Sequence, residues 1–380
     1  MYKFLPYMTN DYSVGLYDES VNDIYHSAFG ALTEAYEKFG KSVFYKLLEG
    51  IDLNILDICY GVGYNTKVII QEALKTNQKL EIDCVDTNKI LLELSPFIKT
   101  EIKFFDRVKY KNFLSKNISN YNEAKKIISY NKKKSIYKID NFVNFIILKA
   151  LIENETHVLS KETEKILFDI NNKPFLSEDL MRFYEFNVKF YDKLYQNKNK
   201  STFVHNIYYR YISNRYNKSL SERFKLNFYS NDIRDFLKTT YKLYDVVFLD
   251  GFTPAKCPVI WSVDLFKRLF EKLDYDGVIV TYNTSAPVRS AMINSGLFIG
   301  NIISTENKII GTIASKNNSN LKYPLTKVQK GLLNTKAGIP YRDMNLSLDN
   351  DTIILNREKE VINSNLISSS KYLKEHKNEI

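Results

Sequence analysis

A short turn with two glycines is the first feature of this sequence that points to chemistry. Residues 57–66, DICYGVGYNT, place Gly61 and Gly63 where the chain turns tightly and a backbone can approach a ligand closely. The helix predicted next begins with free N–H groups that favour polar or anionic ligands. Asp86 ends the following predicted strand, where a carboxylate suits ribose hydroxyls. A tight turn without a ligand is the alternative interpretation. Thr66 replaces the third glycine of the dinucleotide fingerprint, which favours S-adenosylmethionine over a dinucleotide.

Asp232 lies directly after another predicted strand, in the segment YSNDIRDFL. Ligands of mostly parallel sheets bind beyond the carboxyl ends of the strands, so this carboxylate suits an adenine amino group. Asp is also a good N-cap for the helix predicted to start at IRDFLK. The two roles are compatible, and the sequence favours neither.

A second acidic segment, VVFLDGFTPAKCPVIW at residues 246–261, follows an apolar strand. Asp250 at the end of that strand is suited to orient or deprotonate an amine nucleophile. Lys256 suits a phosphate, while Phe252 and Trp261 suit stacking on a base. A structural turn whose aromatic side chains pack on the next helix is the alternative.

Aromatic and basic residues alternate in HNIYYRYISNRYNKS, residues 205–219. Arg210 and Arg215 stand among four tyrosines, a composition that suits stacked bases and phosphates. Ordinary helix packing explains the tyrosines equally well. The segment is therefore a candidate nucleic-acid contact.

Strands that alternate with helices are predicted to position these residues. Apolar or β-branched runs indicate strands near residues 54–61, 80–86, 225–232, 244–251, 277–283, 297–304 and 308–315. Helices are predicted at 65–75, 262–274 and 286–296. The pattern predicts an α/β fold with a mostly parallel, doubly wound sheet. Only TENK separates the last two strands, which predicts a terminal antiparallel hairpin. This is the layout of Rossmann-like, class I methyltransferases.

The charge is concentrated in one internal segment. The chain of 380 residues has a net charge of +10, yet residues 107–225 hold 24 Lys and Arg against 12 Asp and Glu, so the rest carries −2. No glycine occurs between Gly63 and Gly251. We predict a basic, mainly helical insertion at 107–225 between the halves 1–106 and 226–345. A biased spacer is the alternative. Residues 346–380 form an extension whose last part, SSSKYLKEHKNEI, is predicted to fray.

Several classes of protein are excluded by what the sequence contains. The cysteines Cys59, Cys84 and Cys257 form no CxxC pair, and four histidines lack metal-binding spacing, so no protein-built metal site is expected. Cys59 and Cys84 are expected inside strands. No long apolar segment or secretion signal is visible, which predicts a cytoplasmic protein without membrane contact.

Four separated motifs resemble the MnmC-like methyltransferases, which methylate a modified wobble uridine of tRNA. The segment at 248–261 is the most specific of them, whereas the glycine pair alone is weak. Cys59 stands where the family usually has the first glycine of its loop, and the insertion is unusual, so its role cannot be inferred from the family. The motifs are TNDYS at 9–13 with YHSAFGALTEAYEKF at 25–39, ILDICYGVGYNT at 55–66, FLDGFTPAKCPVIW at 248–261 and GIPYRD at 338–343.

The resemblance implies a role for each matching residue. Gly61, Gly63 and Asn65 would line the methionine part of S-adenosyl-L-methionine, Asp86 would take the ribose and Asp232 the adenine. Tyr25 and Glu34 are expected to border that pocket. Asp250 would face the substrate amine. The residues expected from their chemical types, rather than from the resemblance, to contact the substrate are Phe252, Lys256, Trp261, Arg210 and Arg215.

The function implied is methylation of 5-aminomethyluridine to 5-methylaminomethyluridine at the tRNA wobble position, with the anticodon stem-loop as partner. The family's two-domain members add a flavin-dependent oxidoreductase, and no second glycine-rich loop occurs before Ile380. We therefore expect methyl transfer alone, with a separate enzyme supplying the aminomethyl group. The alternatives are a methyltransferase of the same fold acting on a small-molecule or protein amine, with the insertion as lid or dimerisation element, and a non-catalytic RNA-binding module.

Overall fold

The computed structural model describes residues 4–8, 11, 13–18, 23–26, 30–73, 76–88, 91–92, 95 and 223–377. The chain divides into two compact units. The first comprises Met1–Ala35, Gly61–Val68 and Asn88–Ser221, and the second comprises Tyr36–Tyr60, Ile69–Thr87 and Glu222–Ile380. No helix within the described ranges is long and apolar enough to cross a membrane.

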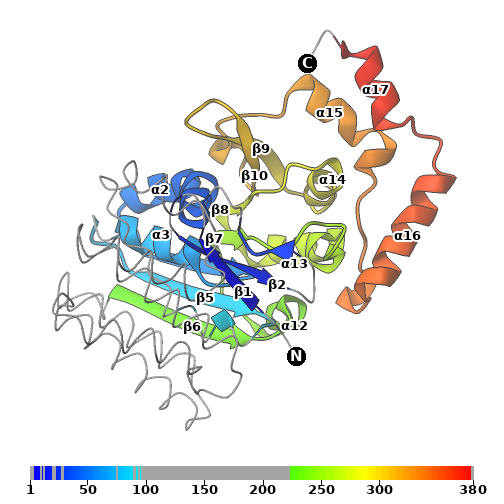
Figure 1. Cartoon of the computed structure of the whole chain (residues 1–380). Coiled ribbons are helices and arrows are strands. Elements are labelled where there is room, and N and C mark those ends of the chain that lie inside the picture. Colours follow the sequence, from blue (N-terminus) through cyan, green and yellow to red (C-terminus); the bar gives the residue numbers. More distant parts are fainter. Residues whose placement is uncertain are drawn as a thin grey trace, which may run out of the picture. The chain divides into compact units, whose positions relative to one another are not determined.

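A seven-stranded sheet forms the centre of the second unit (Figure 1). Its strand order is β6-β5-β4-β7-β8-β10-β9. The neighbours from β6 to β8 pair in parallel, whereas β10 pairs antiparallel with both β8 and β9. The predicted fold, with its terminal hairpin, is thereby confirmed. The strands are β4 (Leu53–Ile58), β5 (Leu80–Asp86), β6 (Phe224–Ser230), β7 (Tyr244–Leu249), β8 (Leu273–Thr281), β9 (Phe298–Ile303) and β10 (Ile309–Ser315).

The central strands are apolar along most of their length because both faces of the sheet are covered. Five of the six residues in β4 and in β7 are buried, with no alternation between the two faces. Continuous burial of this kind is typical of parallel strands between layers of helices. The large apolar side chains of β7, including Phe248, are fully buried.

Helices follow the strands, as the sequence pattern predicts. The contacts of α13 with both α12 and α14 place these three helices along the sheet (Figure 1). Ser262 caps α13 by accepting a hydrogen bond from the Leu265 N–H at 3.1 Å. The helices are α2 (Lys41–Leu48), α3 (Tyr64–Ala73), α12 (Ile233–Thr239), α13 (Val263–Lys272), α14 (Ala286–Asn294), α15 (Lys327–Leu333), α16 (Asn350–Asn363) and α17 (Ser369–Glu375), with short 3₁₀ turns at Pro258–Trp261, Asn318–Asn320, Lys336–Gly338 and Met344–Leu346.

The first unit contains a small antiparallel sheet that the sequence analysis does not predict. Strands β1 (Phe4–Met8), β2 (Val14–Asp18) and β3 (Asp23–Ile24) pair in the order β1-β2-β3. The four-residue helix α1 (Ala31–Glu34) continues into a π-helical turn at Ala35–Gly40. The strands are too short to show a clear alternation of apolar residues, which explains why the pattern misses them.

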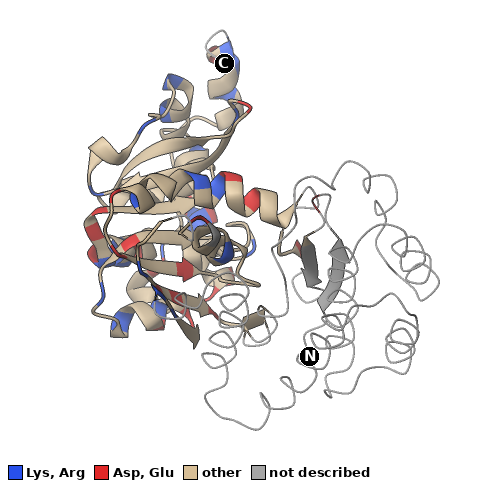
Figure 2. Cartoon of the chain, turned by 90° about the vertical axis from the view of Figure 1, so that its left-hand side faces the viewer, with Lys and Arg blue, Asp and Glu red and all other residues tan. Residues whose placement is uncertain are grey.

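Two predictions about the periphery have different outcomes. In the part predicted to fray, Ser369–Glu375 form helix α17, which Ser368 caps and which packs on α15; fraying itself stays a prediction. Except for residues 223–225, the insertion predicted at 107–225, including Arg210 and Arg215, lies outside the described residues. Within the part that is described, acidic and basic residues are interspersed along the helices (Figure 2).

Candidate functional site

Three of the predicted acidic residues lie along one edge of the seven-stranded sheet. Asp86 ends β5, Asp232 follows β6 by two residues and Asp250 follows β7 directly. Because β4 to β7 are parallel, their carboxyl ends share this edge. Hydrogen bonds join the strand ends: the Asn231 N–H donates to the Asp86 carbonyl at 3.1 Å, and the Asp250 N–H to the Ile58 carbonyl at 3.3 Å.

Two cysteines lie close to these carboxylates. Burial raises the pKa of the Cys59 thiol well above its usual range, and the negative charge of Asp86 raises it further, followed by smaller contributions that include Asp250. Burial also raises the pKa of Cys257 to about 11, with Asp232 as the next cause. Both thiols are free of disulfides and uncharged at neutral pH, so neither is an activated nucleophile.

Cys59 does not lie inside a strand, which corrects the sequence-based expectation. Strand β4 ends at Ile58, and Cys59 begins the turn with a φ of 59°, in the left-handed region. A residue with a Cβ pays about 1 to 2 kcal/mol in this conformation, which glycine adopts freely. The position therefore favours the glycine that the MnmC-like pattern has there. Cys84, in contrast, lies inside β5 and is fully buried as expected.

The glycine turn in the first unit has the backbone that the sequence predicts. Gly61 and Gly63 have φ angles of 56° and 79°, both in the left-handed region. Helix α3 begins at Tyr64, and Asn65 in its first turn is buried. The turn thus brings a helix N-terminus and a polar side chain next to two residues without a Cβ.

A buried lysine that the sequence analysis overlooks braces this turn. The Lys67 Nζ donates to the carbonyls of Val62 at 2.8 Å and Ser95 at 2.7 Å. The Ser95 hydroxyl also donates to the Val62 carbonyl, at 2.8 Å. Burial lowers the pKa of Lys67 well below its usual range. No spacing rule marks a single lysine inside an apolar helix for this task, so sequence reasoning had no signal for it.

The N-terminal motif is explained by capping of α1. The Ser13 hydroxyl accepts hydrogen bonds from the N–H groups of Ala31 at 3.0 Å and Leu32 at 3.3 Å. The Asp11 carboxylate accepts one from the Thr33 N–H at 2.7 Å. Together they satisfy the first backbone donors of the helix, which otherwise lack partners.

The same motif also contacts the residue that follows the glycine turn. The rings of His26 and Tyr64 meet edge to face, with centroids 5.0 Å apart. Tyr25 directly follows β3 and Glu34 ends α1, and both are half-buried in the first unit. That Tyr25 and Glu34 border a cofactor pocket stays a prediction.

The segment after Asp250 folds back over the end of β7. The Trp261 indole N–H donates to the Phe252 carbonyl at 2.8 Å, and the Tyr282 hydroxyl to the Gly251 carbonyl at 2.9 Å. Trp261 is completely buried, which favours packing over the stacking on a base proposed from sequence. Phe252 is half-buried, whereas Lys256 is exposed and accessible to a substrate.

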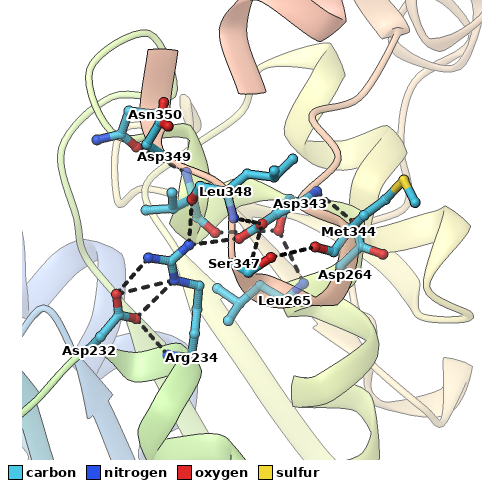
Figure 3. A network of polar contacts seen from close by, with 12 residues as sticks. Asp232, Arg234, Asp264, Leu265, Asp343, Met344, Ser347, Leu348, Asp349 and Asn350 are labelled. Carbon is cyan, nitrogen blue, oxygen red and sulfur yellow. Dashed lines mark hydrogen bonds and ion pairs between the residues drawn. The ribbon is translucent and has the colours of Figure 1, made fainter. Parts of the chain in front are cut away.

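The GIPYRD motif packs against the far end of this segment. The Val263 N–H donates to the Tyr341 carbonyl at 3.0 Å, and the Asp343 N–H to the Asp264 carboxylate at 2.7 Å. Asp343 also forms an ion pair with Arg234, which in turn binds Asp232 (Figure 3). Two motifs that are 77 residues apart in sequence, counted from Trp261 to Gly338, therefore belong to one structure.

The carboxylate acceptors at this edge fit a nucleoside-containing cofactor. Carboxylates at the ends of the adjacent parallel strands β5 and β6 suit ribose hydroxyls and a base amino group. Hydrogen bonds from Arg234 and its charge outweigh the effect of partial burial, so the pKa of Asp232 lies below its usual range and it remains an ionised acceptor. The glycine turn before α3 suits the approach of a ligand to the backbone.

Comparisons with known proteins agree with this chemistry. The model of the family Methyltransf_30, described as S-adenosyl-L-methionine-dependent methyltransferase, matches residues 196–317. Over 65 residues the chain is 34% identical to the tRNA 5-methylaminomethyl-2-thiouridine biosynthesis bifunctional protein MnmC of Burkholderia vietnamiensis. The chain is similar to MnmC-type S-adenosyl-L-methionine-dependent methyltransferases. That match covers 17% of this chain and 10% of the Burkholderia protein.

Two further matches extend over nearly the whole chain. It is 25% identical over 368 residues to Uncharacterized protein MJ0670 of Methanocaldococcus jannaschii, which covers 96% of this chain and 75% of that one. The matched span therefore runs through the segment 107–225. The crystal structure of MnmC2 from Aquifex aeolicus shares the fold, with a TM-score of 0.56 and 18% identity over 96% of this chain and 86% of that one.

Proposed function

We propose that this methyltransferase converts 5-aminomethyluridine to 5-methylaminomethyluridine at the wobble position of tRNA. The position of Asp250 carries the proposal, since it places a carboxylate near Cys59 at the same sheet edge as Asp86, where such sheets bind their ligands. The 34% identity to MnmC, whose name specifies a tRNA methylaminomethyl nucleoside, supports the choice of substrate.

The cofactor of this reaction is S-adenosyl-L-methionine, which supplies an electrophilic methyl group when bound. In the proposal Gly61, Gly63 and Asn65 face its methionine part, Asp86 takes the ribose and Asp232 the adenine amino group. The proposal also keeps Tyr25 and Glu34 as residues that contact the cofactor. The acceptor set of two carboxylates matches the hydroxyl and amino donors of an adenosine.

Asp250 acts on the substrate amine. An alkylamine is protonated at neutral pH, and the resulting ammonium group has no lone pair with which to attack a methyl group. A carboxylate at Asp250 accepts the ammonium proton and holds the amine in line, so catalysis rests on positioning and on removal of that proton. Lys256 on the exposed loop is suited to a tRNA phosphate, and Phe252 beside Asp250 to the base.

The basic segment 107–225 is proposed to bind the tRNA backbone. Its net charge of +12 supplies the positive charge that the remainder of the chain, at −2, lacks. Contacts with phosphates release counterions, so tRNA binding should weaken steeply with salt. Charge reversal of Arg210 and Arg215 should weaken tRNA binding and leave cofactor binding unchanged.

The test is an assay with labelled S-adenosyl-L-methionine and tRNA that bears 5-aminomethyluridine, followed by digestion and identification of nucleosides by mass. We expect a methylated wobble nucleoside whose formation is lost in Asp250→Asn. The matched control is Asp245→Asn, the same change at the opposite end of β7, where an Asn oxygen still accepts the Asn54 N–H hydrogen bond. Cofactor binding without any methylated tRNA would refute the substrate and favour a small-molecule or protein amine.

A further inference from the structure

Arg234 binds the carboxylate of Asp232, the residue proposed to bind adenine, and Arg234 is itself held by the buried carboxylate of Asp343. We propose that Arg234, anchored by Asp343, is a positioning residue that fixes the Asp232 carboxylate for the amino group of adenine and thereby sets the cofactor's base specificity. The inference rests on the proposed role of Asp232. It assigns the GIPYRD motif, which ends at Asp343, to cofactor recognition.

Arg234 fixes the orientation of the Asp232 carboxylate through three donors (Figure 3). Its backbone N–H donates to Oδ1 at 2.8 Å, its Nη2 to Oδ2 at 2.8 Å, and its Nε is shared between Oδ1 at 3.1 Å and Oδ2 at 3.2 Å. Two parallel bonds from a planar guanidinium give more geometric control than a point charge. The carboxylate therefore cannot rotate without losing at least one of these bonds.

The opposite side of the guanidinium is anchored in the protein interior. The Arg234 Nη1 donates to Asp343 Oδ2 at 3.0 Å and to the Leu348 carbonyl at 2.7 Å. The other oxygen of Asp343 accepts the N–H groups of Ser347 at 2.9 Å and Leu348 at 2.8 Å. The Asp343 side chain is 0% exposed, so the surrounding backbone rather than solvent determines its position.

Exposure increases from one end of this network to the other. The side chains of Asp343, Arg234 and Asp232 are 0%, 17% and 32% exposed, respectively. Asp232 is thus the member that faces outward, at the edge of the sheet that also carries Asp86. A network that served only to hold α12 against the C-terminal segment would not require its outermost carboxylate to be accessible.

The remaining hydrogen-bonding capacity of Asp232 determines what it selects. An ionised carboxylate has about four acceptor sites and no donor. With three donors supplied by Arg234, the capacity that remains suits one further donor, such as the amino group at C6 of adenine. A base with a carbonyl oxygen at C6 would place two acceptors against each other, which costs binding free energy because neither can be satisfied.

Calorimetric titration of the full chain with S-adenosylhomocysteine and with its inosine analogue tests the proposal. Asp343→Asn keeps an oxygen for the N–H groups of Ser347 and Leu348 but removes the charge that anchors Arg234. We expect this variant to bind S-adenosylhomocysteine about tenfold more weakly and to discriminate less between the two ligands. The matched control is Asp349→Asn, which keeps the α16 cap in the same segment and should change neither quantity.

Two further variants separate the possible outcomes. Arg234→Lys keeps the positive charge but not the planar guanidinium, so it should also lower the discrimination between S-adenosylhomocysteine and its inosine analogue. This variant provides the test if Asp343→Asn does not fold. Asp232→Asn should weaken S-adenosylhomocysteine binding at least as much as Asp343→Asn. Unchanged affinity in Asp232→Asn would refute the proposed adenine site. A loss in Asp232→Asn with unchanged affinity and discrimination in a folded Asp343→Asn or Arg234→Lys protein would refute the positioning role alone.

Discussion

Gly251→Ala should destabilise the protein through one identifiable contact. A Cβ at Gly251 would collide with the Cδ1 of Ile260 and lie 3.0 Å from the Cys59 Sγ, whereas the next atom of Ile260, Cγ1, would be 3.5 Å away. Gly251 is not among the described residues with a positive φ, so the backbone itself accepts alanine. Overpacking of this kind costs about 1 to 3 kcal/mol of the free energy of unfolding.

Removal of the colliding atom should recover most of that loss. Ile260→Val deletes Cδ1 and by itself costs about 0.5 to 1.5 kcal/mol, since Ile260 is buried. In the double variant the new Cβ meets only ordinary contacts and the sulfur of Cys59. We therefore expect a coupling free energy of about 1 kcal/mol or more, well above the roughly 0.3 to 0.5 kcal/mol that independent sites show.

Urea denaturation of the wild type, both single variants and the double variant measures this coupling. The control pairs Gly251→Ala with Ile302→Val in β9, which is separated from β7 by β8 and β10 and should add independently. If the losses from Gly251→Ala and Ile260→Val are simply additive, the contact with Ile260 is not the reason that glycine is needed here. The packing argument for the loop after Asp250 would then be wrong.

Two other substitutions test electrostatics and backbone conformation. The hydrogen bond from Lys242 lowers the pKa of Glu81 from 4.5 to about 2, with Lys225 helping against the opposing effect of burial. The stability that the pair of Glu81 and Lys242 contributes is present above pH 4.5 and is lost as the pH falls toward 2. Glu81→Gln should therefore lower the free energy of unfolding at pH 7 by roughly 1 to 2 kcal/mol after solvent screening, and it should flatten the pH dependence of that free energy between pH 2 and 4.5. An acid denaturation curve that is unchanged in the variant would contradict this. Gly30→Ala should cost more than about 2 kcal/mol, because Gly30 has a φ of 148° and a Cβ there would collide with the Asp11 carboxylate that caps α1; urea denaturation without a loss would refute it.

The sequence alone determined the sheet and the edge at which we propose that the chemistry occurs. Apolar runs at β4, β5 and β7 predicted buried parallel strands, because strands covered on both faces need apolar side chains throughout. Once the strands are parallel, residues that follow them share one edge. The positions of Asp86, Asp232 and Asp250 therefore followed from local pattern and connectivity, before any long-range contact was known.

Only the tertiary structure decided how those residues are held. The ion pair between Arg234 and Asp343 joins residues 109 positions apart, and no local pattern encodes such a contact. For Trp261 the sequence favoured packing only slightly over stacking, and its complete burial decided for packing. The left-handed backbone of Cys59 could not be predicted from its residue type, because cysteine is common in strands whereas the turn determines its φ. Local sequence fixes which backbone forms, whereas packing between distant segments fixes which side chains remain accessible and which are anchored.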